Sequence, residues 1–215
     1  MKKFAIVLSG CGVYDGAEIQ EAVTAMLAVC RKGHSYQIFA PDMPQYHVLN
    51  HITGEEMPEK RNVMIEAARI ARGNIKDLKS FNSSEYDALL FAGGFGAAKN
   101  LSDFAFKGKD YVVIEQVADT IRSMHGAGKP IGAMCVSPVL IAYVIKGVEL
   151  TLGGICAASE AAEEHGAIHK VTSHGEVTLD KKNKIATTPC YMLDATIAQV
   201  AEGAENLVNE LISLM

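Results

Sequence analysis

Short, unbroken runs of apolar residues alternate along the chain with longer segments that carry apolar residues at helical spacing. Residues 4–9 form such a run, and residues 18–32 show the helical pattern, with Ile19, Ala22 and Val23 on one face. Strands that are apolar on both sides are typical of parallel sheets covered by helices on both faces. The alternation therefore predicts an α/β fold, a three-layer α/β/α sandwich with a mostly parallel sheet and right-handed crossovers.

The same pattern continues to the end of the chain. We expect further strands over residues 35–39, 86–92, 131–134 and 148–152, further helices over 61–72, 112–125, 138–145, 158–165 and 193–215, and short antiparallel strands over 170–173, 176–179 and 184–188, the last two joined as a hairpin. No repeat or long linker divides the sequence, so residues 1–215 are predicted to form a single domain. In such a sheet, ligands bind beyond the carboxyl ends of the strands.

Composition excludes several classes of partner. The formal net charge is −5 and the basic residues are scattered, which predicts neither a nucleic-acid nor a membrane partner. The five cysteines are odd in number, without a CxxC pair, and we find no secretory leader; free thiols and a cytoplasmic location are expected. No Cys/His pair has the usual local spacing of a zinc site, and the close pair His47 and His51 is expected to be two exposed loop histidines, so no metal is predicted.

The segment Lys129–Pro138 has the pattern of a nucleophile elbow. A short apolar strand runs into Cys135, and a helix follows at once, with Ser137 as a candidate cap and Pro138 at the first helical position. The positive end of the helix dipole favours a thiolate at Cys135, which predicts a nucleophile exposed in a cleft. The alternative is a buried cysteine that acts only as a small hydrophobe.

Two further strand ends should lie on the same edge of the sheet as Cys135. They are Gly10–Gly12 and Gly93–Gly96, where glycines let the backbone approach a substrate or simply make turns. The N–H of Val136, together with an N–H of Gly93 or Gly94, is predicted to form an oxyanion hole.

Several polar residues are candidates for the remaining roles. Glu18 and Glu21 begin the first helix, where a carboxylate either satisfies the helix dipole or reaches Cys135 and carries its proton. Cys11, Asn100 and His51 are predicted to line the substrate cleft, and His47 is a second candidate from the same loop as His51.

Several segments together resemble the ElbB group, also called enhancing lycopene biosynthesis protein 2 or isoprenoid biosynthesis glyoxalase. They are residues 9–16, 61–73, 93–101 and 184–189. This group belongs to the class I glutamine amidotransferase-like superfamily, together with the Parkinsonism-associated deglycase and PfpI-type proteases. The resemblance implies one flavodoxin-like domain of that superfamily, a homodimer, and Cys135 as nucleophile with Glu21 as its acidic partner.

The sequence also departs from that superfamily. Val136 stands where amidotransferases and PfpI-type proteases have histidine, and Gly153 stands where the deglycase branch has one. A Cys–His–Glu triad is therefore not expected, and turnover should be slow.

Two functions follow as hypotheses. The resemblance implies a glyoxalase III-type reaction, in which Cys135 converts a small aldehyde such as methylglyoxal or glyoxal to a 2-hydroxy acid without any cofactor. The alternative is a non-catalytic redox-sensing or regulatory protein that uses the same reactive cysteine.

Overall fold

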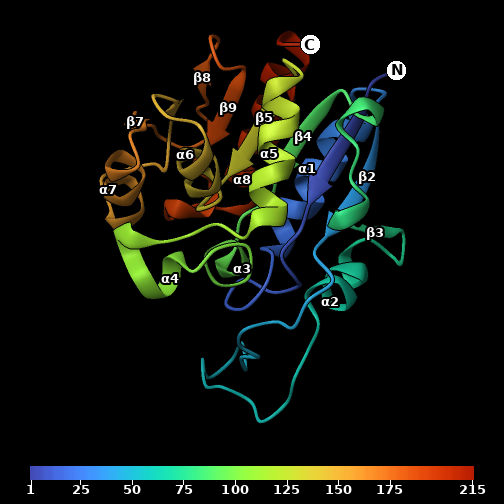
Figure 1. The fold of residues 1–215 in the computed structure, drawn as a ribbon, viewed down its shortest axis with the longest axis vertical. Helices are drawn as coiled ribbons and strands as arrows, with labels where there is room; N and C mark the ends of the chain where they lie inside the picture. The colour runs from blue at the N-terminus through green and yellow to red at the C-terminus, as the bar shows by residue number, and fades with distance from the viewer.

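The computed structural model describes residues 1–215, and its centre is a seven-stranded sheet. The strands are β1 (Lys3–Val7), β2 (Ser35–Ala40), β3 (Ile75–Asp77), β4 (Ala88–Phe91), β5 (Ile131–Met134), β8 (Thr178–Asp180) and β9 (Ile185–Thr188). Their order is β3-β2-β1-β4-β5-β9-β8, and every neighbouring pair is parallel except β8 and β9 (Figure 1). β6 (Glu149–Leu150) and β7 (Ile168–His169) form a separate parallel pair.

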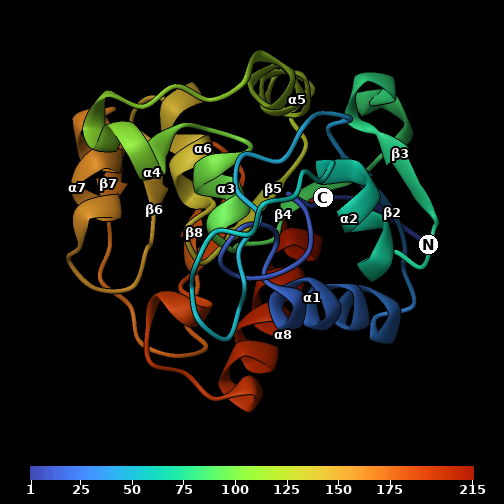
Figure 2. The ribbon, with the colours of Figure 1, turned by 90° about the horizontal axis from the view of Figure 1, so that it is seen from below.

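Helices cover both faces of the sheet (Figure 2). α1 (Ile19–Arg31), α2 (Val63–Ile70) and α8 (Ile197–Ser213) pack on one face, and α5 (Glu115–Gly126) and α6 (Pro138–Val144) pack on the other. α3 (Phe95–Lys99), α4 (Phe104–Lys107) and α7 (Ala157–Glu164) complete the helices, and 3₁₀ turns span Leu78–Ser80, Ser83–Glu85, Gly108–Asp110 and Cys190–Met192. No helix combines the length and the apolar character that crossing a membrane requires.

Strand β1 shows why the two cores form. Its side chains alternate between the faces: Phe4 and Ile6 belong to the core beneath α1 and α8, whereas Ala5 and Val7 belong to the core beneath α5 and α6. Each of these four residues is fully buried. The structure thus confirms the predicted three-layer α/β/α sandwich with a mostly parallel sheet and a small antiparallel hairpin.

The predicted hairpin is present, and two other segments differ from the prediction. β8 and β9 form this antiparallel hairpin, and β9, whose four residues are buried, also pairs in parallel with β5 in the main sheet. Residues 170–173 are not a strand; the N–H groups of Lys170 and Thr172 donate to the carbonyls of Leu150 and Gly153, and Val171 is exposed. β3, a short edge strand that is not fully buried, went unpredicted.

The loops at the carboxyl ends of the strands are tied to one another. The N–H groups of Phe95 and Gly96 donate to the carbonyls of Val13 and Gly16, at 2.7 and 2.8 Å. Glu18 N–H, at the start of α1, donates to the carbonyl of Gly93 at 2.9 Å. In Figure 1, α3 and the long loop of residues 41–62 gather at this end of the sheet. These bonds place the first turn of α1 beside the end of β4.

Candidate active site

Cys135 occupies a sharp turn between β5 and α6. Its φ is 59°, a left-handed conformation that costs a residue with a side chain about 1–3 kcal/mol. The turn is held because the Cys135 N–H donates to the carbonyl of Thr188 at 3.0 Å. Ser137 does not cap α6 as predicted; its hydroxyl donates to the carbonyl of Ala92 at 2.6 Å and ties the elbow to the end of β4.

The Glu21 side chain is the hydrogen-bonding partner of Cys135. It is completely buried, although it lies in the first turn of α1. One carboxyl oxygen accepts from the N–H of Gly93 at 3.1 Å, and the other accepts from the N–H of Tyr191 at 3.2 Å. The carboxyl group is therefore fixed by two loops, one after β4 and one after β9.

Gly93 is the residue that lets the acid and the thiol meet. A Cβ at this position would overlap the Cys135 side chain and the Glu21 carboxylate. Glycine at this position therefore does more than make a turn, because the contact between Cys135 and Glu21 leaves no room for the methyl group of an alanine. Since the Gly93 N–H bonds Glu21, it is not an oxyanion-hole donor, which corrects the prediction for this residue.

The N–H groups of Gly94 and Val136 both bond the Cys135 sulfur and lower the pKa of the thiol. They are the two predicted oxyanion-hole donors that the structure brings to the sulfur. Burial, followed by the charge of Glu21, nevertheless raises the pKa of Cys135 well above its ordinary value. The expectation of a thiolate held by the helix dipole is therefore wrong, because burial outweighs the N-terminus of a seven-residue helix.

Burial also raises the pKa of Glu21, to about 8. The neighbouring Glu18 carboxylate raises this pKa further, whereas the hydrogen bonds from Tyr191, Cys135 and Gly93 lower it. Glu21 is therefore mostly protonated at neutral pH and exchanges its proton within the range where a general acid or base is effective.

Glu18 was predicted as a candidate catalytic acid, but in the structure it caps a helix. Its carboxylate caps α1, accepting from the Glu21 N–H at 2.6 Å, and it also accepts from the N–H groups of Ile19 and Gln20. We find no contact between Glu18 and Cys135. Glu18 therefore positions the helix turn that carries Glu21.

A cavity of about 390 Å³ opens at Cys135. It is lined by residues from six segments of the chain: Val13, Gly94, Phe95, Ala98, Phe104, Ala105, Cys135, Val136, Cys156, Ala157, Ala158, Tyr191 and Met192. None of these is a histidine, an acid, a lysine or an arginine. Tyr191 and Cys156 were not predicted as site residues from the sequence. The apolar run that forms β9 could have indicated Tyr191, because Tyr191 follows a strand that lies beside β5.

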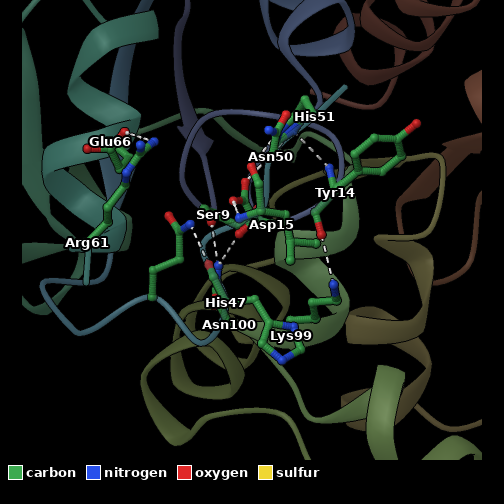
Figure 3. A network of polar contacts seen from close by, with 12 residues as sticks. Ser9, Tyr14, Asp15, His47, Asn50, His51, Arg61, Glu66, Lys99 and Asn100 are labelled. Atoms are coloured by element: carbon green, nitrogen blue, oxygen red, sulfur yellow. Dashed lines mark hydrogen bonds and ion pairs between the residues drawn. The ribbon is translucent and has the colours of Figure 1, made fainter. Parts of the chain in front are cut away.

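The structure places the three predicted cleft residues outside this cavity. Asn100 is buried and braces the loop after β1, donating to the carbonyls of Ser9 and Asp15, both at 2.9 Å (Figure 3). His51 lies in a separate cavity beside Tyr14 and accepts from the Tyr14 N–H at 3.3 Å. These two side chains therefore support the loop and do not reach the thiol.

Cys11 is half-buried and does not line the cavity. Burial raises the pKa of its thiol, the charges of Glu66 and Asp15 raise this pKa further, and Arg69 and Arg61 lower it. The Arg61 and Glu66 side chains form an ion pair at 3.5 Å next to it. The end of β1 thus does not bring Cys11 to Cys135.

No group of three or more His, Cys, Asp or Glu side chains is arranged to hold a metal ion. His47, the other predicted candidate from the long loop, packs against the rings of Tyr46 and Phe106. Proton transfer at Cys135 therefore falls to Glu21 among the groups that the structure brings to the sulfur.

Comparison with known proteins finds relatives over almost the whole chain, although no family model matches it. The human protein "Glutamine amidotransferase-like class 1 domain-containing protein 3, mitochondrial" is 45% identical over 222 residues, covering 99% of this chain and 83% of its own. "ES1 protein homolog, mitochondrial" of Rattus norvegicus is also 45% identical, over 99% of this chain and 84% of its own. Both names include the word mitochondrial, and the cytoplasmic location expected here stays a prediction.

Solved structures share the fold. An isoprenoid biosynthesis protein with an amidotransferase-like domain from Ehrlichia chaffeensis is 31% identical, with a TM-score of 0.91 over 99% of this chain and 100% of that one. Glyoxalase III from Candida albicans has a TM-score of 0.62 over 100% of this chain and 97% of that one. At 14% identity, this second likeness is one of fold alone.

Proposed function

The chain belongs to the glutamine amidotransferase-like class 1 family, and from this and the pair at Cys135 we infer that it is a glyoxalase III-type enzyme. It converts small 2-oxoaldehydes to 2-hydroxy acids without a cofactor. The observation that carries the proposal is the buried contact between Cys135 and Glu21, with the Gly94 and Val136 N–H groups on the sulfur and a cavity in front of it. The resemblance described above supports assignment to the isoprenoid biosynthesis glyoxalase group within that family.

The reaction begins with addition of the Cys135 sulfur to the aldehyde carbon, as the thiol proton passes through Glu21 to the new oxygen. The product is a hemithioacetal. Glu21 then takes the proton from that carbon and returns it to the neighbouring carbon through an enediol, while the hydroxyl proton moves from the first oxygen to the second. The resulting 2-hydroxy thioester is hydrolysed by water, which releases the 2-hydroxy acid and restores the thiol.

Each part of the site suits a step in this sequence. A group with a pKa of about 8 both gives and accepts protons near neutral pH, as the enediol step requires. The Gly94 and Val136 N–H groups are the donors available to negative charge that develops beside the sulfur. Amidotransferase and protease chemistry are not supported, because no histidine lines the cavity.

Replacement of the thiol tests the proposal directly. We expect the wild-type protein to form lactate from methylglyoxal, and Cys135→Ser to lower kcat/KM by at least about a thousandfold, because a serine hydroxyl beside a carboxyl of pKa about 8 is a poor nucleophile. Cys30→Ser, at an exposed cysteine of α1, is the matched control and should keep full activity. Lactate formation is followed enzymatically.

The opposite results are equally clear. Lactate formation that survives in Cys135→Ser contradicts the thiol mechanism. A wild-type protein that is inert to 2-oxoaldehydes, but whose Cys135 is oxidised reversibly by hydroperoxide, supports the non-catalytic redox alternative.

The outer face of α1 supports a homodimer as part of the proposal. Ile19, Val23 and Leu27 recur every fourth residue and are each more than 40% exposed. Apart from the buried Glu21, residues 19–30 carry no charge, which is unusual for an exposed helix face. An uncharged patch is self-complementary, because two copies related by a twofold axis bring no like charges together.

We expect Leu27→Glu to convert a dimer to a monomer, since it places two carboxylates in one apolar contact. Sedimentation velocity measures the change, and circular dichroism checks that the variant is folded. Ile65→Glu, at an exposed isoleucine of α2, is the control and should remain dimeric. A monomeric wild-type protein, or a Leu27→Glu variant that stays dimeric, rejects this interface.

A further inference from the structure

The cavity in front of Cys135 is far more apolar than a binding site for glyoxal needs to be. Apart from Gly94, its lining residues are hydrophobic, and they include two phenylalanines, a methionine and a valine: Phe95, Phe104, Met192 and Val13. Its polar groups include the N–H groups of Gly94 and Val136, which bond the Cys135 sulfur. The Tyr191 hydroxyl bonds the side chain of Gln20.

The cavity is also larger than a two- or three-carbon aldehyde. At about 390 Å³ it has the volume of roughly a dozen water molecules in the liquid, and it falls in the range of pockets that hold drug-sized ligands. Glyoxal or methylglyoxal at the sulfur therefore leaves most of an apolar space unfilled. A substrate with a larger apolar group gains from displacing water that these walls bind poorly.

The walls also discriminate against charge. No lysine or arginine lines the cavity, and the nearest ionisable group to the sulfur is the buried acid Glu21. A carboxylate or phosphate on the substrate loses its hydration there without finding a partner. The chain as a whole carries a net charge of −5, which adds no general attraction for anions.

We propose that the substrates of this site are 2-oxoaldehydes that carry an uncharged aromatic or alkyl group, and that the cavity binds this group between Phe95, Phe104 and Met192. The proposal rests on the function inferred above for Cys135 and names its substrate class. The dicarbonyl end of such a molecule faces Cys135 and the Gly94 and Val136 N–H groups, and its apolar group fills the space in front of them.

A matched substrate series tests this class. We expect kcat/KM for phenylglyoxal to exceed that for methylglyoxal by about tenfold or more, and to exceed that for 4-carboxyphenylglyoxal by a similar factor. The first pair differs in apolar surface, and the second pair differs in charge at nearly constant shape. Equal values within either pair, or a preference for methylglyoxal, overturn the proposal.

One variant narrows the cavity without burying a new group in the core. Ala157 lines the cavity at its rim, in the first turn of α7, and is exposed. Ala157→Phe should lower kcat/KM for phenylglyoxal about tenfold, mainly through KM, and lower kcat/KM for methylglyoxal by a clearly smaller factor. Ala198→Phe, at an exposed alanine in the first turn of α8, is the control and should change neither. Parallel losses for both substrates in Ala157→Phe contradict the proposed binding mode.

Binding without turnover separates this proposal from the function on which it rests. Acetophenone has the aryl ketone of phenylglyoxal but no aldehyde, so it cannot be converted. We expect it to slow alkylation of Cys135 by iodoacetamide at least threefold, whereas 4-acetylbenzoate should not. Protection without turnover of any 2-oxoaldehyde rejects the enzyme and keeps the apolar ligand class; turnover of methylglyoxal without protection or aryl preference rejects the substrate class alone.

Discussion

Replacing Gly93 with alanine is expected to remove the activity and to lower the free energy of unfolding by about 3 kcal/mol. The φ of Gly93 is not in the left-handed region, so its backbone accepts an alanine. The added Cβ instead overlaps the Cys135 side chain and the Glu21 carboxylate, both of which are buried. One of them must move, and a shift of about 1 Å at reacting groups costs on the order of a hundredfold in rate.

Urea unfolding and lactate formation measure the two effects of Gly93→Ala. Gly126→Ala is the matched control, because this glycine ends α5, also lacks a positive φ and has open space around it. The control should keep full activity and gain up to about 1 kcal/mol in stability. A Gly93→Ala protein with wild-type stability and rate means that Glu21 and Cys135 are not in contact in solution.

Replacing Glu21 with glutamine is expected to lower kcat/KM by about a hundredfold or more, because the proton acceptor of the thiol is lost. In the wild-type enzyme, kcat/KM should rise with pH to a plateau, with the midpoint of the rise near pH 8, where Glu21 loses its proton. That rise should be absent from the variant. Glu115→Gln, at an exposed acid in the first turn of α5, should leave both the rate and its pH profile unchanged.

The same carboxyl should make stability fall as the pH rises. The pKa of Glu21 is about 8 in the folded protein, against an ordinary value of 4.5. Because the folded state holds this proton more tightly, the stabilisation is complete below the ordinary pKa and is lost as the pH rises through about 8. Between about pH 5 and pH 8, the loss is of the order of 3 kcal/mol.

Urea unfolding of the wild type and Glu21→Gln across this pH range isolates the contribution of Glu21, since other titrating groups are common to both proteins. The wild type should lose stability relative to the variant as the pH rises. Parallel stability curves for the two proteins show that the pKa of Glu21 is not raised on folding.

The sequence pattern predicts the sheet well where strands are apolar on both faces. β1, β4 and β5 are fully or almost fully buried runs, and each follows from its residues alone. β9 was predicted as one strand of the hairpin that it forms with β8, but its parallel pairing with β5 was not predicted, because four residues do not reveal every neighbour with which they pair. The edge strand β3 is short and incompletely buried, so it has no clear pattern.

The site was predictable in part. The strand–cysteine–helix pattern located Cys135, and the glycines at the end of β4 located its neighbours. The choice between Glu18 and Glu21 depends on which acid enters the core and which one caps the helix, and their spacing alone leaves that open. Cys11 and His51 belong to loops after neighbouring strands, but the structure places Cys11 near Glu66 and Arg69 and bonds His51 to the Tyr14 N–H, neither of them at the cavity, which no local pattern records.

The attachment of Glu21 to Tyr191 has a consequence for how the protein is made. Their hydrogen bond joins residues 170 positions apart, and β9, which leads to Tyr191, inserts beside β5. In a ribosome-bound chain that has not yet emerged beyond residue 184, β5 is an open edge of the sheet. Such a chain also lacks the Tyr191 N–H, one of the two backbone groups that bond the Glu21 carboxyl. Contacts between residues so far apart in the sequence carry a large loop-closure cost. The thiol and its acid thus acquire their final geometry only once the C-terminal segment is in place, so nascent chains lack the assembled reactive centre.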